Sequence, residues 1–137
     1  MLYVDIPTRS ELDELIAARS DASVTIVLAT TAHTQDTDKA RIQLGNLVKQ
    51  AVEQLETVGV AKRIVAAVEE QIHDLQDDDD FWKFQANSLA IFVTPDSLRS
   101  FRLPTTLNDM VQVSDRFHLK PLLRAATFGQ HAFVLAL

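Results

Sequence analysis

The chain has 137 residues, 47% of them hydrophobic and 23% charged, and a formal net charge of −6. This composition is typical of one globular domain that buries a core without metals or disulfides, and no apolar run is long enough to cross a membrane. The absence of cysteine excludes disulfides, thiolate catalysis and cysteine-based zinc sites and is typical of a cytoplasmic protein, and the negative charge disfavours nucleic-acid binding over the whole surface.

The N-terminal part predicts a short helix followed by a buried strand. Thr8 and Glu11 match the capping-box pattern Thr-x-x-Glu, and apolar residues then repeat at helical spacing up to about Arg19. Residues 23–30 are β-branched and almost wholly apolar, which predicts a central strand buried on both faces.

The clearest pattern in the sequence is a pair of amphipathic helices. The first has Asp36 or Thr37 as its N-cap, a stripe of apolar residues at helical spacing, and Gly59 as its C-terminal signal. The stripe consists of Leu44, Leu47, Val48, Ala51, Val52, Leu55 and Val58. A second stripe starts at once and extends from Ala61 to Leu75, so the two helices should form an antiparallel hairpin.

The rest of the sequence predicts mainly strands. The acidic run 77–80 should cap a turn of helix, and residues 88–94 and 97–103 should form a β-hairpin around Pro95 and Asp96. Two further strands are expected at 110–113 and 131–137. Between them, 117–124 should form a short turn or helix that Pro121 interrupts.

This order of elements predicts an α/β (α+β) fold in two layers, with a mixed β-sheet packed against the helical hairpin and a short N-terminal helix in addition. Phe81, Trp82 and Phe84 should seal the interface between helix and sheet, although aromatic residues at this spacing also stack on bases.

No arrangement of residues predicts catalysis. The carboxylates of residues 77–80 are a candidate metal site, but consecutive side chains point in different directions and no calcium-loop pattern follows. His73 and Asp74 diverge by about 100° on a helix, so they are a poor catalytic pair. We therefore expect no catalytic residues, no metal and no cofactor.

Two polar loops are the candidate contacts with RNA or a partner. Lys39 and Arg41 lie near the start of the long helix, beside opposing acidic residues. Arg116, His118 and Lys120 lie in a loop within the mildly basic segment 95–137, which holds five basic and three acidic side chains. The alternatives are a solvated loop for the first group and a salt-bridged connector for the second.

Several phrases, taken in order, carry a resemblance that covers nearly the whole chain from about Ser10. They are Arg-Ile-Gln-Leu-Gly-Asn-Leu at 41–47, Asp-Asp-Asp-Phe-Trp at 78–82 followed by Gln85, Leu-Ala-Ile-Phe-Val-Thr-Pro at 89–95, Phe-Arg-Leu-Pro at 101–104 and Val-Ser-Asp-Arg-Phe-His-Leu-Lys-Pro-Leu-Leu at 113–123. The series resembles the N-terminal region of the bacterial archaeo-eukaryotic release factor family. The resemblance implies a larger protein whose first domain is residues 1–130, with 131–137 as the first strand of the next domain.

The resemblance also implies work on the ribosome or on tRNA. In the related archaeal and eukaryotic factors the first domain reads the codon through an Asn-Ile-Lys-Ser loop, and the second promotes peptidyl-tRNA hydrolysis through a Gly-Gly-Gln loop. Here the loop at 34–41 does not match the first motif, and the chain contains no Gly-Gly-Gln. We therefore expect a non-catalytic, ribosome- or tRNA-associated module. The alternative is a structural or oligomerisation domain, and a homo-oligomer fits either reading.

Overall fold

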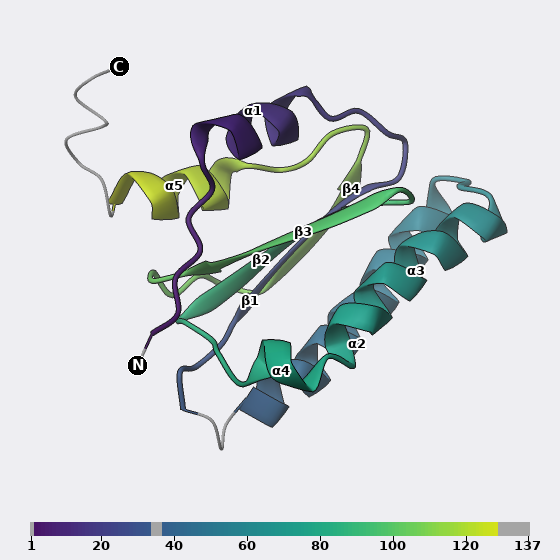
Figure 1. The fold of residues 1–137 in the computed structure, drawn as a ribbon. Coiled ribbons are helices and arrows are strands. Elements are labelled where there is room, and N and C mark those ends of the chain that lie inside the picture. The colour runs from purple at the N-terminus through teal and green to yellow at the C-terminus, as the bar shows by residue number, and fades with distance from the viewer. Residues whose placement is uncertain (1, 34–36, 129–137) are drawn as a thin grey trace.

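The computed structural model describes residues 2–33 and 37–128, which fold around one antiparallel sheet (Figure 1). In chain order, the elements in these residues are α1 (Arg9–Ala17), β1 (Ser23–Ala29), α2 (Thr37–Thr57), α3 (Lys62–Gln76), α4 (Asp79–Trp82), β2 (Ser88–Thr94), β3 (Ser97–Leu103), β4 (Met110–Ser114) and α5 (Lys120–Phe128). None of the described helices is long and apolar enough to cross a bilayer.

The sheet has the strand order β3-β2-β1-β4, so β1 and β2 lie at its centre. Ile26 of β1 pairs with Ile91 of β2 on one side and with Val111 of β4 on the other. All of β2 and nearly all of β1 are buried, which confirms the prediction of a central strand with two covered faces.

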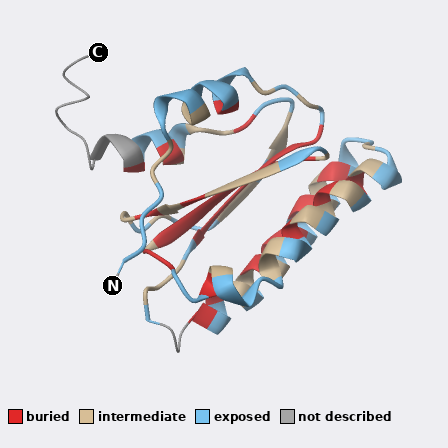
Figure 2. Cartoon of the chain, in the orientation of Figure 1, coloured by how far each residue is buried: buried red, intermediate tan, exposed pale blue. Residues whose placement is uncertain are grey.

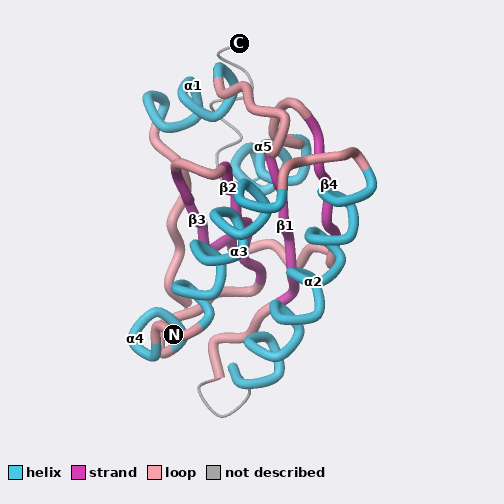
Figure 3. The backbone as a smooth tube through the Cα atoms, turned by 90° about the vertical axis from the view of Figure 1, so that its right-hand side faces the viewer, coloured by secondary structure: helices cyan, strands magenta, loops and turns pink. Residues whose placement is uncertain are grey.

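Helices cover both faces of the sheet. Helices α2 and α3 of the hairpin lie side by side on one face, and α1 and α5 lie on the other (Figures 1 and 3). Alternate residues of β1 and β2 pack into the two cores because successive strand residues point to opposite faces of the sheet. The hairpin side receives Val24, Ile26, Leu28, Leu89, Ile91 and Val93, and the opposite side receives Val27, Ala90 and Phe92. Buried residues therefore line both faces of the central strands (Figure 2).

The α/β class and the packing of the helical hairpin on the sheet are confirmed, but three details differ from the prediction. Every strand pairing within residues 2–33 and 37–128 is antiparallel, so the sheet described here is not mixed. The two central strands are apolar on both faces, so α1 and α5 add a third layer to the expected two. Pro121 lies in the first turn of α5 rather than interrupting a helix, because an amide in the first turn has no acceptor within the helix and its loss costs little. The strand expected at 131–137 lies outside the described residues, as does the domain boundary at residue 130.

The predicted end signals of the helices are in place. The Thr8 amide donates to Glu11 Oε1 at 2.9 Å and the Glu11 amide donates to Thr8 Oγ1 at 3.1 Å, which completes the capping box. Asp78 accepts from the Phe81 amide at 3.1 Å and caps α4. Gly59 has a φ of 83° in the turn between α2 and α3. Sequence signals thus fix where these helices begin and end.

The aromatic residues in and after α4 contact side chains or backbone groups of neighbouring segments. Trp82 is 2% exposed, and its indole nitrogen donates to the Leu75 carbonyl at 3.1 Å. Phe81 lies against Trp82 in an edge-to-face contact, and Phe84 contacts Tyr3 with ring centroids 4.6 Å apart. Phe81 and Trp82 therefore have the expected role at the interface between helix and sheet, whereas Phe84 is 43% exposed and lies against the N-terminal segment instead.

Candidate functional site

The predicted contact residues lie at opposite ends of the sheet. Lys39 and Arg41 are in the first turns of α2, close to the end of β1. Asp109 links the end of β1 to α2, because one of its carboxylate oxygens accepts from the Ala29 amide at 2.8 Å and the other from Gln43 Nε2 at 3.1 Å. The loop 115–119 follows β4 at the other end, where Ser114 pairs with Ser23. The two groups therefore do not form one basic surface.

Arg41 joins three helices. Its Nε donates to the Gln76 carbonyl at 2.6 Å and its Nη2 to Asp79 Oδ1 at 2.8 Å. Gln76 Nε2 returns a hydrogen bond to the Arg41 carbonyl at 3.0 Å. The guanidinium thus ties the start of α2 to the end of α3 and to α4, whereas Lys39 is exposed to solvent.

The loop 115–119 is anchored at three points. The Asp115 carbonyl accepts from the Ser20 amide at 3.0 Å, and the His118 amide donates to Thr25 Oγ1 at 2.9 Å. Phe117 is 8% exposed, and its ring centroid lies 5.4 Å from that of Phe92. These anchors make the loop a fixed part of the fold.

The charged groups of this loop lie at its surface. Arg116 and Lys120 are exposed and His118 is half-buried. Arg116 Nε lies 3.4 Å from Asp115 Oδ1. The hydrogen bond and positive charge of this guanidinium, together with the Ser114 hydroxyl, hold the pKa of Asp115 below its usual range. Arg116 and Lys120 are thus at the surface of the same short segment, and the half-buried His118 lies between them in sequence.

Two other arginines of the mildly basic segment form ion pairs within the fold. Arg99 pairs with Glu11 at 3.4 Å and with Glu14, which fastens β3 to α1. Arg102 pairs with Asp5 at 2.7 Å, and its guanidinium carbon lies 4.5 Å from the centroid of the Phe81 ring. Much of the local positive charge is therefore neutralised by acidic residues that are distant in sequence.

The acidic run that follows α3 also has structural partners. Asp78 caps α4, Asp79 pairs with Arg41, and Asp80 pairs with Lys83 at 3.1 Å. In the described part of the chain, no group of three or more His, Cys, Asp or Glu side chains is placed to hold a metal ion. Most carboxylates of this run therefore have a structural role as a helix cap or in an ion pair.

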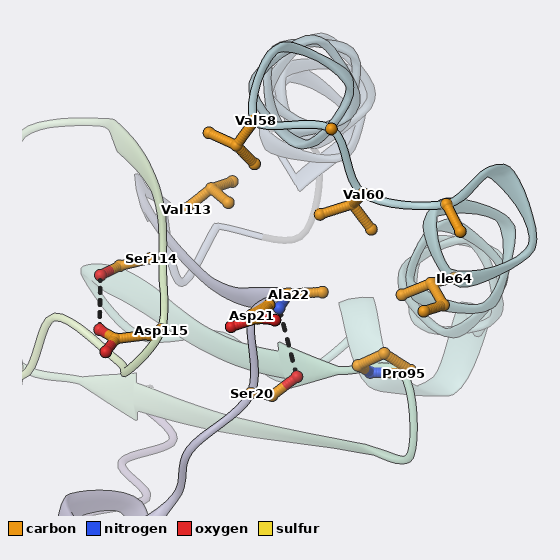
Figure 4. Close-up of a pocket in the computed structure, with 12 residues that line it drawn as sticks. Ser20, Asp21, Ala22, Val58, Val60, Ile64, Pro95, Val113, Ser114 and Asp115 are labelled. Carbon is orange, nitrogen blue, oxygen red and sulfur yellow. Dashed lines mark hydrogen bonds between the residues drawn. The ribbon is translucent and has the colours of Figure 1, made fainter.

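A pocket of about 550 Å³ lies near the turn between α2 and α3. Four chain segments line it: 20–22, the turn and first residues of α3 at 58–61 and 64, Pro95, and 113–115. Figure 4 shows apolar side chains of the hairpin opposite the carboxylates of Asp21 and Asp115. No sequence pattern predicts this pocket, because its lining comes from segments far apart in the chain. The apolar pair Val58 and Val60 flanking Gly59 is the one local signal.

No family model and no curated protein matches this chain.

Proposed function

We propose that this domain is a non-catalytic binding module of a release-factor-like protein that associates with the ribosome or tRNA. The observation that carries the proposal is the ordered series of phrases between residues 41 and 123. Their order and spacing extend over most of the chain, whereas a single phrase such as Asp-Phe-Trp has little specificity.

The residues of these phrases contact one another in the fold. Arg41 of the first phrase pairs with Asp79 of the second. Arg102 of the fourth phrase lies over the ring of Phe81, also in the second. A sequence that keeps these phrases would keep the same contacts between helices and strands. This supports a shared fold, from which the shared binding role is inferred.

The surface we assign to RNA contact is the anchored loop 115–119 with the start of α5. Arg116 and Lys120 project from it beside the half-buried His118. A loop held by hydrogen bonds and a buried aromatic ring presents cations with little loss of entropy on binding. Arg41 is the weaker candidate because its guanidinium already serves the fold.

Ribosome co-sedimentation of the full-length protein, repeated over a range of salt concentrations, tests the proposal. The double variant Arg116→Ala, Lys120→Ala should bind about tenfold more weakly. The slope of its log binding constant against log salt concentration should be smaller by about 1 to 2. The variant Arg63→Ala, Lys49→Ala removes the same residue types from the hairpin and should bind like the wild type. A protein that stays in the supernatant at low salt refutes the association, and equal binding by the two double variants refutes the assigned surface.

The alternative of an oligomerisation domain has less support. In the described part of the chain, the exposed large hydrophobic residues of the helical hairpin are Ile42 and Val58, at opposite ends of α2. Two separated side chains do not make the continuous apolar face that a stable interface between copies needs. Light scattering of the chain that shows a concentration-dependent dimer would revive this alternative.

A further inference from the structure

The pocket between the helical turn and the end of β4 combines an apolar wall with acidic groups. Val60, Ile64 and Val113 are partly buried against the main core. These three side chains thus form an apolar surface that extends from the core to the pocket. Within the described chain, the charged residues that line the pocket are Asp21 and Asp115, and no lysine, arginine or histidine is among them. An apolar group with a neighbouring cation is the chemistry that complements such a lining.

The two carboxylates are placed differently. Asp115 accepts from the Ser114 hydroxyl at 3.2 Å and from Arg116 at 3.4 Å, so its charge is partly compensated. Asp21 is exposed, and no hydrogen bond or ion pair within the described residues engages its carboxylate. Figure 4 shows Asp21 in the middle of the lining, to the left of Val60. Of the two carboxylates, Asp21 is therefore the one whose charge is left uncompensated by the described residues.

Val58 forms the outer lip of the apolar wall. Val58 is 64% exposed, more than any other valine among the described residues. Gly59, with its φ of 83°, makes the tight turn that separates Val58 from Val60. Val58 and Val60 thus lie on two sides of the same opening (Figure 4).

We propose that this pocket docks an extended segment of a partner protein in which apolar side chains alternate with lysine or arginine. Its volume of about 550 Å³ is within the range of ligand sites, but it is open to solvent and would not enclose a small molecule. A protein segment can seat an apolar side chain against Val58 and Val60 while its cations face Asp21 and Asp115. The net charge of −6 favours the approach of such a segment.

This proposal is separate from the RNA contact assigned to Arg116 and Lys120, and either can fail alone. A competing occupant also has support, because α3 begins beside the pocket and its N-cap residue, Ala61, makes no side-chain cap hydrogen bond. A helix N-terminus favours anions, so an acidic segment is the competing occupant.

The test uses the 137-residue chain and short fluorescein-labelled peptides. In one peptide leucine alternates with lysine, in the second leucine alternates with glutamate, and in the third serine alternates with lysine. Binding is measured by fluorescence anisotropy, and its location by amide chemical shifts of Gly59, Val60, Val113 and Ser114. A single-stranded oligouridine RNA is titrated in the same way.

The leucine–lysine peptide should bind and shift these amides. The variant Asp21→Asn, Asp115→Asn should weaken it about tenfold, while Asp74→Asn, Asp80→Asn, which changes the net charge equally at the other end of α3, should not. Val58→Ser should weaken it about threefold. Thermal melts check folding. If loss of Asp115 destabilises the chain, Asp21→Asn alone carries the test, because its carboxylate has no partner among the described residues.

Four outcomes overturn the proposal: no binding of the leucine–lysine peptide, an equal loss in both double variants, no effect of Val58→Ser, or equal binding of the serine–lysine peptide. The last two would show that charge alone attracts the peptide. Stronger binding of the leucine–glutamate peptide would assign the pocket to an acidic partner. Shifts of the same amides by oligouridine alone would assign it to RNA.

Discussion

Gln54 of α2 covers the outer edge of β4 as a neighbouring strand would. Its Nε2 donates to the Val111 carbonyl at 3.4 Å, and the Val113 amide donates to its Oε1 at 3.2 Å. Within the described sheet, β4 is the edge strand next to β1, so these two backbone groups have no ladder partner. One side-chain amide thus supplies both a donor and an acceptor, which predicts that Gln54→Ala destabilises the fold.

The expected loss follows from the two hydrogen bonds. Each contributes roughly 0.5–1 kcal/mol at these rather long distances, and the freed groups are only partly rehydrated because Val111 and Val113 are half-buried. Alanine is the better helix former by about 0.3 kcal/mol, which offsets a part of the loss. We expect a net destabilisation of about 1 kcal/mol.

Gln50→Ala is the matched control, since Gln50 lies one turn earlier on the same helix and is exposed. It shares the gain in helix propensity but loses no bond to β4, so the two variants should differ by about 1.3 kcal/mol in urea unfolding. Light scattering should also show self-association of Gln54→Ala at high concentration, because an uncovered strand edge can pair with another copy. A difference below about 0.3 kcal/mol would refute the role assigned to Gln54, since this is about the error of such comparisons.

Three further predictions concern stability. Arg41→Ala should cost about 2 kcal/mol in urea unfolding, since it removes two hydrogen bonds between helices, while Lys39→Ala should change little; equal effects would contradict the structural role of Arg41. Gly59→Ala should cost about 1 kcal/mol in thermal unfolding from its positive φ alone, because an added Cβ would meet no atom within 4 Å. A larger loss would indicate a steric clash instead. The hydrogen bond from the Thr8 amide lowers the pKa of Glu11, and the Thr8 hydroxyl and the charge of Arg99 lower it further. The folded state therefore favours the carboxylate. Its contribution, about 0.5 kcal/mol for this half-exposed group, should be present above the ordinary pKa of about 4.3 and be lost as pH falls through the lowered value. The gap in unfolding free energy between the wild type and Glu11→Gln should therefore close on acidification, and a gap that widens would show the sign to be wrong.

Local patterns predicted most of the fold. The capping box at Thr8, the stripes of the two long helices and the Pro95–Asp96 turn each specify an element through residues close in sequence. The layers were less predictable. β1 and β2 are apolar on both faces, and only the packing of α1 and α5 shows that the second face is also covered by helices.

The candidate site was less predictable than the fold because pairing depends on distant residues. Sequence alone shows Arg99 and Arg102 as surplus positive charge, but Glu14 and Asp5, from the first residues of the chain, neutralise them. Arg41 is likewise predicted as a loop cation and is instead bound by the end of α3. Arg116 and Lys120 stay at the surface, and their contact with RNA stays a prediction.

The contacts around the Phe81 carbonyl show why the resemblance supports the fold more directly than it supports a binding role. This oxygen accepts from Gln85 Nε2 at 2.9 Å and from Arg102 Nη2 at 3.4 Å, and Arg102 in turn holds Asp5 of the N-terminal segment. Two of the phrases that carry the resemblance, 78–85 and 101–104, therefore meet at one contact between α4 and β3. A relative could keep these residues for stability and still bind a different partner. The discriminating residues are those that this contact does not use, namely Arg116 and Lys120 at the surface and Asp21 in the pocket, so variants at these positions test binding without disturbing the fold.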